Sequence, residues 1–165
     1  MADLTLEVEN GYFSYRVGAI IIHENKILMV KNDNYPYYYS VGGRVHFNEA
    51  SEEAILREVY EETQIHFEID RLAFLHENFF VGEFLGSKPV HEISLFFLLK
   101  PNRKIDSLRC DSVSSEGVKE TLHWLTIDEL PNYPIFPEFF KTELKQIEGK
   151  VGHFITRGEN TFCLN

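Results

Sequence analysis

The sequence has few cysteines, few basic residues and no long apolar run, and each shortage excludes a class of protein. Two cysteines among 165 residues are too few for a disulfide framework, and they lack the spacing of a zinc site. Lysine and arginine number 16 against 26 acidic residues, which argues against a nucleic-acid polymer as partner. No stretch approaches the roughly 18 apolar residues of a membrane-spanning helix, and the first residues lack a signal-peptide pattern. The composition therefore predicts a soluble, cytoplasmic protein without a membrane partner.

The order of the elements predicts a single α/β domain covering residues 1–165. A hydrophobic fraction of 44% is adequate for one core, and no repeat or linker interrupts the chain. Strand patterns cover 12–23, 26–31, 66–81, 92–100 and 122–127. Helical patterns cover the middle of the first half and Pro137 to Ile147.

Carboxylates are concentrated between Gly43 and Ile65, a stretch that holds six glutamates in 23 residues. Glu58, Glu61 and Glu62 sit at i, i+3 and i+4, which places them on one face of a helix. By itself such a helix is typical of a solvated face. Clustered anions repel one another unless a cation lies between them, however, and hard oxygen ligands suit Mg²⁺, Mn²⁺ or Ca²⁺ rather than zinc.

The residues around these carboxylates favour the cation site. Gly42 and Gly43 form a loop before the helix, where the backbone can approach a ligand closely. Arg57 lies one turn from both Glu53 and Glu61, so we expect it to pair with them at i,i+4 spacing. The opposite face is expected to be buried against a sheet, and it carries Ile55, Leu56 and Val59.

This stretch resembles the signature of the Nudix hydrolases: Gly, five residues, Glu, seven residues, then Arg-Glu-apolar-any-Glu-Glu-any-Gly-apolar. The matching positions are Gly43, Glu49, Arg57, Glu58, Val59, Glu61, Glu62 and Ile65. Gln64 replaces the last glycine of the signature, and Val41 stands where many members have proline. Glycine at a helix C-terminus usually adopts the left-handed conformation, so we expect Gln64 to cost about 1 kcal/mol without removing a ligand.

The resemblance implies the Nudix fold, an α/β/α sandwich with a central curved mixed β-sheet. It also implies divalent-metal-dependent hydrolysis of a pyrophosphate bond in a nucleoside diphosphate linked to another moiety. Nucleoside triphosphates, ADP-ribose-like compounds and nucleotide sugars all contain that bond, so the motif does not select among them. The implied metal is Mg²⁺, for which Mn²⁺ can substitute.

The resemblance also implies roles for individual residues in and beside the stretch from Gly43 to Ile65, which we call the box. The metal ligands would be Glu58, Glu61, Glu62 and the backbone carbonyl of Gly42. Arg57 would orient the carboxylates, while Gly43 and Glu49 would be structural members.

The base that takes the proton from the attacking water has three candidates. One is Glu62, and the others are Glu116 and Glu120, because Nudix proteins often use a further acidic residue from a loop after the box. A loop glutamate is also often only a solvated charge.

Tyrosines at 35, 37 and 39 are candidates for substrate binding, because exposed aromatic rings can stack on a base or sugar. Tyrosines that alternate along a strand are equally typical of half-buried packing. We therefore expect Tyr35, Tyr37 and Tyr39 to contact the nucleoside or to pack beside it.

Two other functions remain as alternatives to the hydrolase. One is a Nudix-fold protein that binds or senses a nucleotide without cleaving it; known regulators of this kind carry a DNA-binding domain, and only 18 residues follow Ile147 here. The other is an acidic divalent-metal protein with a structural role. Many Nudix proteins form homodimers, but no segment of this sequence identifies an interface.

Overall fold

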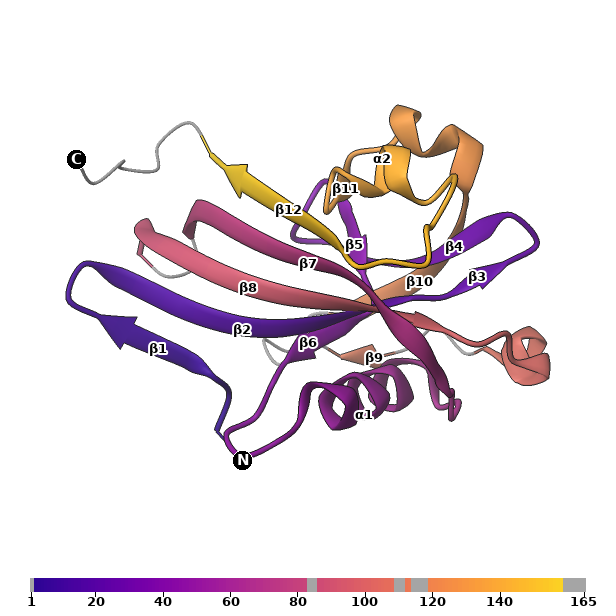
Figure 1. The fold of residues 1–165 in the computed structure, drawn as a ribbon, viewed down its shortest axis with the longest axis horizontal. Coiled ribbons are helices and arrows are strands. Elements are labelled where there is room, and N and C mark those ends of the chain that lie inside the picture. Colours follow the sequence, from indigo (N-terminus) through magenta and orange to yellow (C-terminus); the bar gives the residue numbers. More distant parts are fainter. Residues whose placement is uncertain (1, 83–85, 109–111, 114–118, 159–165) are drawn as a thin grey trace.

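Two curved sheets with helices on opposite sides make up the structure, a computed structural model that describes residues 2–82, 86–108, 112–113 and 119–158 (Figure 1). The helices are α1 (Ser51–Thr63) and α2 (Phe140–Glu143), with 3₁₀ helices η2 (Arg103–Ser107) and η3 (Ile127–Asn132). Among these described segments, no helix is long and apolar enough to cross a membrane. The expected α/β class, with helices flanking curved mixed sheets, is confirmed.

The first sheet has the strand order β1-β2-β8-β7-β12, with β6 paired to β2. Its strands are β1 (Thr5–Val8), β2 (Gly11–Ile20), β6 (Gly42–Arg44), β7 (Ile69–Gly82), β8 (Lys88–Leu99) and β12 (Gly152–Arg157). The β2–β8 and β7–β12 pairs are parallel and the others antiparallel, so the sheet is mixed.

The second sheet has the order β11-β5-β4-β10-β9, with β3 paired to β4. Its strands are β3 (Ile22–His23), β4 (Lys26–Asn32), β5 (Tyr38–Ser40), β9 (Ser112–Val113), β10 (Lys119–Thr126) and β11 (Ile135–Phe136). The expected tight turn between β3 and β4 is confirmed, because Glu24 and Asn25 both have left-handed backbones with φ of 46° and 60°. Two such residues are typical of a two-residue hairpin turn.

The core packs α1 against both sheets. Ile55 and Val59 are fully buried and join a cluster that includes Val17 of β2 in the first sheet and Val30 of β4 in the second. Leu56 was expected beside them, but that prediction is wrong: its side chain is 37% exposed. One residue turns a helix by about 100°, which carries Leu56 away from the buried stripe.

The predicted helix from Pro137 to Ile147 is much shorter in the structure, where α2 spans Phe140–Glu143. Aromatic contacts determine the path of this segment more than helix periodicity does. Phe140 is fully buried, and the adjacent Phe139 stacks on Phe154 of β12 at 4.2 Å between ring centroids. Two neighbouring rings that are packed in different directions cannot form the single apolar stripe of a long amphipathic helix.

The buried His76 of β7 should make the stability of the protein depend on pH. Its side chain is 6% exposed, its Nε2 lies 2.8 Å from the hydroxyl of Thr156 on β12, and burial lowers its pKa to about 4. The stability associated with a neutral His76 is present above the unfolded pKa of about 6.5 and is lost as pH falls toward 4. We therefore expect His76 to lower the free energy of unfolding by about 2 kcal/mol between pH 7 and pH 5.

Urea unfolding of His76→Phe measures this contribution, because phenylalanine keeps a ring in the site and removes the titration. The difference in unfolding free energy between pH 7 and pH 5 should shrink by about 2 kcal/mol relative to the unsubstituted protein. His66→Phe is the matched control, since His66 is exposed and stacks on Tyr60. An unchanged pH dependence in His76→Phe would contradict the prediction.

Candidate metal and active site

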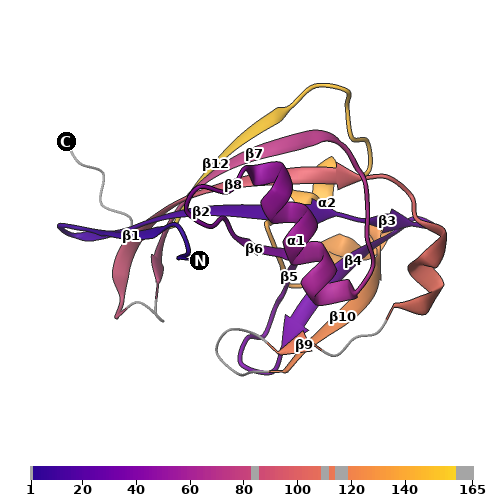
Figure 2. The same cartoon turned by 90° about the horizontal axis from the view of Figure 1, so that it is seen from below.

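The acidic residues of interest lie on α1, which packs beside β6 and β2 (Figure 2). The helix begins where the Glu53 carboxylate accepts a hydrogen bond from the backbone N–H of Ala50 at 2.9 Å. Glu53 thus caps the helix, and among its described contacts there is no pair with Arg57, so the expected Glu53–Arg57 pair is wrong. The helix ends at Gln64, which adopts the left-handed conformation (φ 59°, ψ 20°) expected of the glycine that it replaces.

Gln64 offsets part of its backbone strain through its own side chain. Its Nε2 donates to the carbonyl oxygens of Tyr60 and Glu61 at 3.1 and 3.2 Å. Carbonyls at a helix C-terminus otherwise lack partners within the helix. The substitution in the box therefore changes the helix end and leaves the carboxylates in place.

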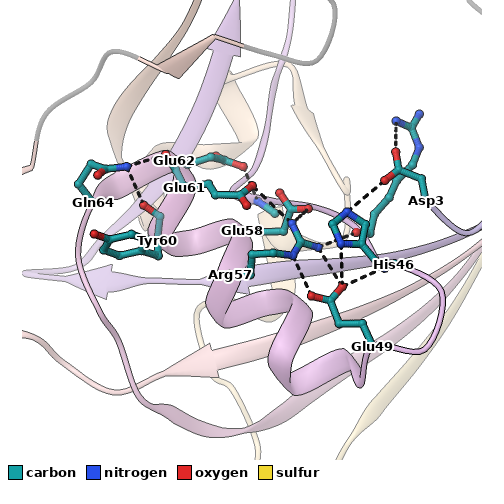
Figure 3. A network of polar contacts seen from close by, with 11 residues as sticks. Asp3, His46, Glu49, Arg57, Glu58, Tyr60, Glu61, Glu62 and Gln64 are labelled. Atoms are coloured by element: carbon teal, nitrogen blue, oxygen red, sulfur yellow. Dashed lines mark hydrogen bonds and ion pairs between the residues drawn. The ribbon is translucent and has the colours of Figure 1, made fainter. Parts of the chain in front are cut away.

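Arg57 is the centre of the polar network on α1 (Figure 3). Its guanidinium donates two hydrogen bonds to Glu49, at 2.8 and 3.0 Å, one to Glu58 at 2.8 Å and one to Glu61 at 3.4 Å. A further bond reaches the carbonyl oxygen of Arg44 at 3.1 Å. The hydrogen bond from Arg57 is the main cause that lowers the pKa of Glu49 to about 2. Arg57 therefore joins the loop before the helix to the acidic face, and the expected Arg57–Glu61 pair is present.

Glu49 is also held by the loop that precedes the helix. Its Oε2 accepts from the backbone N–H of His46 at 2.9 Å, and the His46 ring lies 3.4 Å from Asp3 near the chain start. Asp3 also lies 3.8 Å from the guanidinium of Arg44. No sequence pattern indicates Asp3 or His46, because their contact joins distant segments and follows no fixed spacing.

Glu62 lies deepest of the three box carboxylates. Its Oε1 accepts from the backbone N–H of Gly42 at 3.1 Å, while its Oε2 is sealed from solvent and has no hydrogen-bond partner in the described part of the chain. Burial raises its pKa well above the ordinary value; the Gly42 N–H opposes this, and the charges of Glu120 and Glu58 add to it. Burial also raises the pKa of Glu58, against the effect of Arg57.

Gly43 allows the carboxylate of Glu58 to lie against the backbone of β6. A Cβ atom added at Gly43 would overlap all three atoms of that carboxylate group. Gly42 has φ of 139°, which L side chains rarely adopt, and its own added Cβ would overlap the carbonyl oxygen of Val17. The expected loop at Gly42 and Gly43 is wrong, because both residues lie in β6. Gly42 is required by its backbone conformation and its approach to Val17, whereas a side chain at Gly43 would displace the carboxylate of Glu58.

Glu120 of β10 brings a fourth carboxylate to this region from the second sheet. Its Oε1 accepts a hydrogen bond from the hydroxyl of Tyr39 at 2.6 Å, and its charge contributes to the raised pKa values of both Tyr39 and Glu62. Glu116, the other expected acidic residue, lies outside the described residues.

These residues fit a hard divalent cation. All the candidate side-chain donors are carboxylate oxygens, and the unpartnered Oε2 of Glu62 is the kind of buried polar atom that a ligand would satisfy. Among the described residues, no three Asp, Glu, His or Cys side chains are already close enough together to hold a metal ion. Glu58 and Glu61 instead accept hydrogen bonds from Arg57. A cation there would draw these carboxylates together and compete with Arg57 for them.

Arg16 of β2 is a cation near this site that the sequence did not indicate. Burial raises the pKa values of Glu58 and Glu62, and the charge of Arg16 opposes that rise as a minor effect. The Arg16 guanidinium lies 3.9 Å from Glu92. A single arginine inside a strand pattern has no spacing that marks it, so only the fold identifies it.

The predicted tyrosines form a row that leads away from Glu120. Tyr35 stacks on Tyr37 at 5.3 Å between ring centroids, and Tyr37 meets Tyr39 edge-on at 6.4 Å. Phe136 of β11, 48% exposed, lies edge-on to Tyr37 at 4.8 Å. Phe136 also belongs to this row. No sequence pattern indicates it, because its strand β11 pairs with β5 through a long-range contact.

Comparison with known proteins identifies the fold and the family. The NUDIX domain model matches residues 13–143, whereas a search of curated proteins finds no match. A crystal structure of the mutator MutT protein from Bacillus halodurans is similar, with a TM-score of 0.65 and 18% identity over 92% of this chain and 95% of that one. A MutT NUDIX hydrolase from Burkholderia pseudomallei has a TM-score of 0.58 and 24% identity over 82% and 98% of the two chains.

An ADP-ribose pyrophosphatase from Streptococcus suis is similar as well, with a TM-score of 0.55 and 16% identity over 86% of this chain and 98% of that one. At these identities the structural matches establish the fold. The family model covers most of the chain, including the whole glutamate-rich stretch. The chain therefore belongs to the Nudix hydrolase family, the class of pyrophosphohydrolases whose signature its box resembles.

Proposed function

We propose that the protein hydrolyses a pyrophosphate bond in a nucleoside diphosphate linked to another moiety, and that it requires a divalent cation, Mg²⁺ or Mn²⁺. The observation that carries this proposal is the buried, unpartnered Oε2 of Glu62 beside Glu58 and Glu120 in a chain with a NUDIX domain. Carboxylates that lie this near one another cost stability unless a cation offsets their repulsion.

The chain's residues have distinct parts in the proposed reaction. Glu58, Glu61, Glu62 and the carbonyl of Gly42 hold the cation, which supplies charge neutralisation for the substrate phosphates and the leaving group. Arg57 keeps the carboxylates in register through its hydrogen bonds to Glu58 and Glu61.

Proton removal from the attacking water requires an ionised carboxylate within reach of that water near the cation. Glu62 is our first candidate for the base, because its Oε2 is buried and has no hydrogen-bond partner in the described part of the chain. Glu120 is the second, because its charge acts on Glu62 from the facing strand. Glu116 remains a candidate from the sequence.

The aromatic row beside Glu120 supports a nucleoside as part of the substrate. Tyr35, Tyr37 and Phe136 are partly exposed rings near the acidic site, and such rings stack on bases with little sequence preference. Nucleoside triphosphates and ADP-ribose-like compounds, the latter suggested by the name of the Streptococcus suis relative, are the substrates to try first. Cytoplasmic location and a homodimer remain predictions.

A release assay tests the proposed function. The purified protein is incubated with a panel of nucleoside triphosphates, ADP-ribose, dinucleoside polyphosphates and nucleotide sugars, with Mg²⁺, with Mn²⁺ or with a chelator. The nucleotide products are separated by anion-exchange chromatography, because ADP-ribose and nucleotide sugars yield two phosphate monoesters and no free phosphate or pyrophosphate. We expect product from at least one substrate with either metal and none with chelator. Nucleotide binding without release across the panel would contradict hydrolysis and favour the nucleotide-sensing alternative.

A further inference from the structure

The hydroxyl of Tyr39 links three strands of the second sheet beside the proposed metal site. It donates to Glu120 Oε1 on β10 at 2.6 Å and accepts from Nδ2 of Asn32 on β4 at 3.2 Å. The backbone N–H of Asn34 in turn donates to Oδ1 of Asn32 at 3.0 Å. The contacts form one continuous chain from the backbone at Asn34 to the carboxylate of Glu120.

The direction of each hydrogen bond in this chain follows from chemistry. The N–H of Asn34 can only donate, so it must meet Oδ1 of Asn32, and Nδ2 then faces Tyr39. Nδ2 also can only donate, so the Tyr39 oxygen accepts there and its own proton is directed at Glu120. Glu120 thus receives a short hydrogen bond from a donor whose orientation is fixed.

Burial and register fix the position of this chain. Asn32 is 6% exposed and lies directly opposite Glu120 in the antiparallel pairing of β4 with β10. Val30, two residues earlier on β4, is the partner of Tyr39 on β5. The two strands that flank β4 therefore contribute the tyrosine and the glutamate, and Asn32 between them is too constrained to turn away.

The orientation of Glu120 matters because Glu120 acts on the deepest box carboxylate. Its negative charge is felt by Glu62, whose Oε2 has no partner in the described part of the chain. The Tyr39 hydroxyl donates its hydrogen bond to Oε1 of Glu120, so Oε2 of the same carboxylate is left to coordinate a cation. A carboxylate held through one oxygen loses less side-chain freedom when the other binds a cation.

We propose that Tyr39, itself oriented by Asn32, is a positioning residue that holds Glu120 toward the divalent-cation site next to Glu62. This inference rests on the proposed function, and it gives Tyr39 a role other than stacking on the nucleoside. Tyr35 and Tyr37, whose rings continue the row outward, remain the candidates for that contact.

Binding of Mn²⁺ to the metal-free protein tests the proposal without any substrate. Free Mn²⁺ is measured by electron paramagnetic resonance during titration of four proteins: the unsubstituted chain, Tyr39→Phe, Glu120→Ala and the double variant. We expect Tyr39→Phe to weaken Mn²⁺ binding by about 10-fold, a typical effect of an outer-shell partner, and to add little in the Glu120→Ala background.

Tyr15→Phe is the matched control. Tyr15 and Tyr39 are both half-buried and pack against the same core cluster, and no hydrogen bond from the Tyr15 hydroxyl is found among the described residues. We expect its Mn²⁺ affinity to equal that of the unsubstituted chain. Asn32→Asp is a second variant, because a carboxylate at that position would draw the Tyr39 proton away from Glu120 and should also weaken binding.

Two outcomes would overturn the proposal. One is unchanged Mn²⁺ affinity in Tyr39→Phe when Glu120→Ala weakens it. The other is a Tyr39→Phe protein whose only defect is a raised KM for the substrate, because that result would make Tyr39 a substrate contact. If the unsubstituted protein binds Mn²⁺ but hydrolyses nothing, the proposed function fails while the titration still decides the role of Tyr39.

Discussion

Glu62→Gln is expected to reduce turnover by at least about 100-fold, the scale on which a positioned acid–base or metal-binding carboxylate contributes. The amide keeps the oxygen that accepts from Gly42 but replaces Oε2 with a nitrogen that can only donate. Glu61→Gln is expected to show a loss of the same size, because it removes one charge from the helix face that would hold the cation. Rates are measured with the substrate found in the release assay, at saturating Mg²⁺.

The same substitution should leave the fold of the protein intact. Burial already disfavours the ionised form of Glu62, so a neutral amide in its place should preserve or raise the free energy of unfolding. Glu52→Gln, on an exposed position in the first turn of α1, is the control and should retain full activity. Turnover close to that of the unsubstituted protein in both Glu61→Gln and Glu62→Gln would refute the mechanism.

Arg57→Ala should have the largest effect on stability. It leaves Glu49 and Glu58 without their main cationic partner, and removal of one member of a mostly buried ion pair typically costs about 3–5 kcal/mol. Arg57→Lys should fall between alanine and arginine, because lysine keeps the charge but cannot form the two parallel bonds to Glu49. The free energy of unfolding in urea at pH 7 measures both changes.

The pH dependence gives an independent check on the Arg57–Glu49 pair. The pKa of Glu49 falls from an ordinary value of 4.5 to about 2 in the folded protein. Its stabilising contribution is therefore present above pH 4.5 and is lost as pH falls from there toward 2. In Arg57→Ala this component of the acid sensitivity should shrink to the part that the backbone N–H and the charge of His46 maintain.

Arg71→Ala is the control for the removal of an arginine. Arg71 is similarly half-buried, but its ion pair with Asp70 is long, at 3.9 Å, so we expect a cost of no more than about 1 kcal/mol. Equal losses of stability in Arg57→Ala and Arg71→Ala would show that the network around Arg57 has no special importance.

Local signals in the sequence predicted the box well. Fixed spacing placed Glu58, Glu61 and Glu62 on one helix, and the family model matches the same stretch. The hairpin at Glu24–Asn25 and the left-handed Gln64 were also predictable, because each depends on the conformation of one or two residues.

Contacts between distant segments were not predictable in the same way. The bond between Tyr39 and Glu120 joins residues separated by 81 positions, and no pattern in one sequence encodes that pairing. The short α2 was missed because ring packing on β7 and β12 overrides the helical period around Phe139. The roles of the site residues therefore remain proposals that the variants above can test.

The parallel pairing of β2 with β8 has a consequence for how the protein reaches its native state. Tyr12 lies opposite Val90, so this pairing closes a long loop before its contacts can contribute. Domains dominated by such non-local pairs have high contact order and fold slowly, on a scale of about milliseconds to seconds. Because the box packs on β2 while Glu120 comes from the other sheet, we expect activity to return only after both sheets have formed.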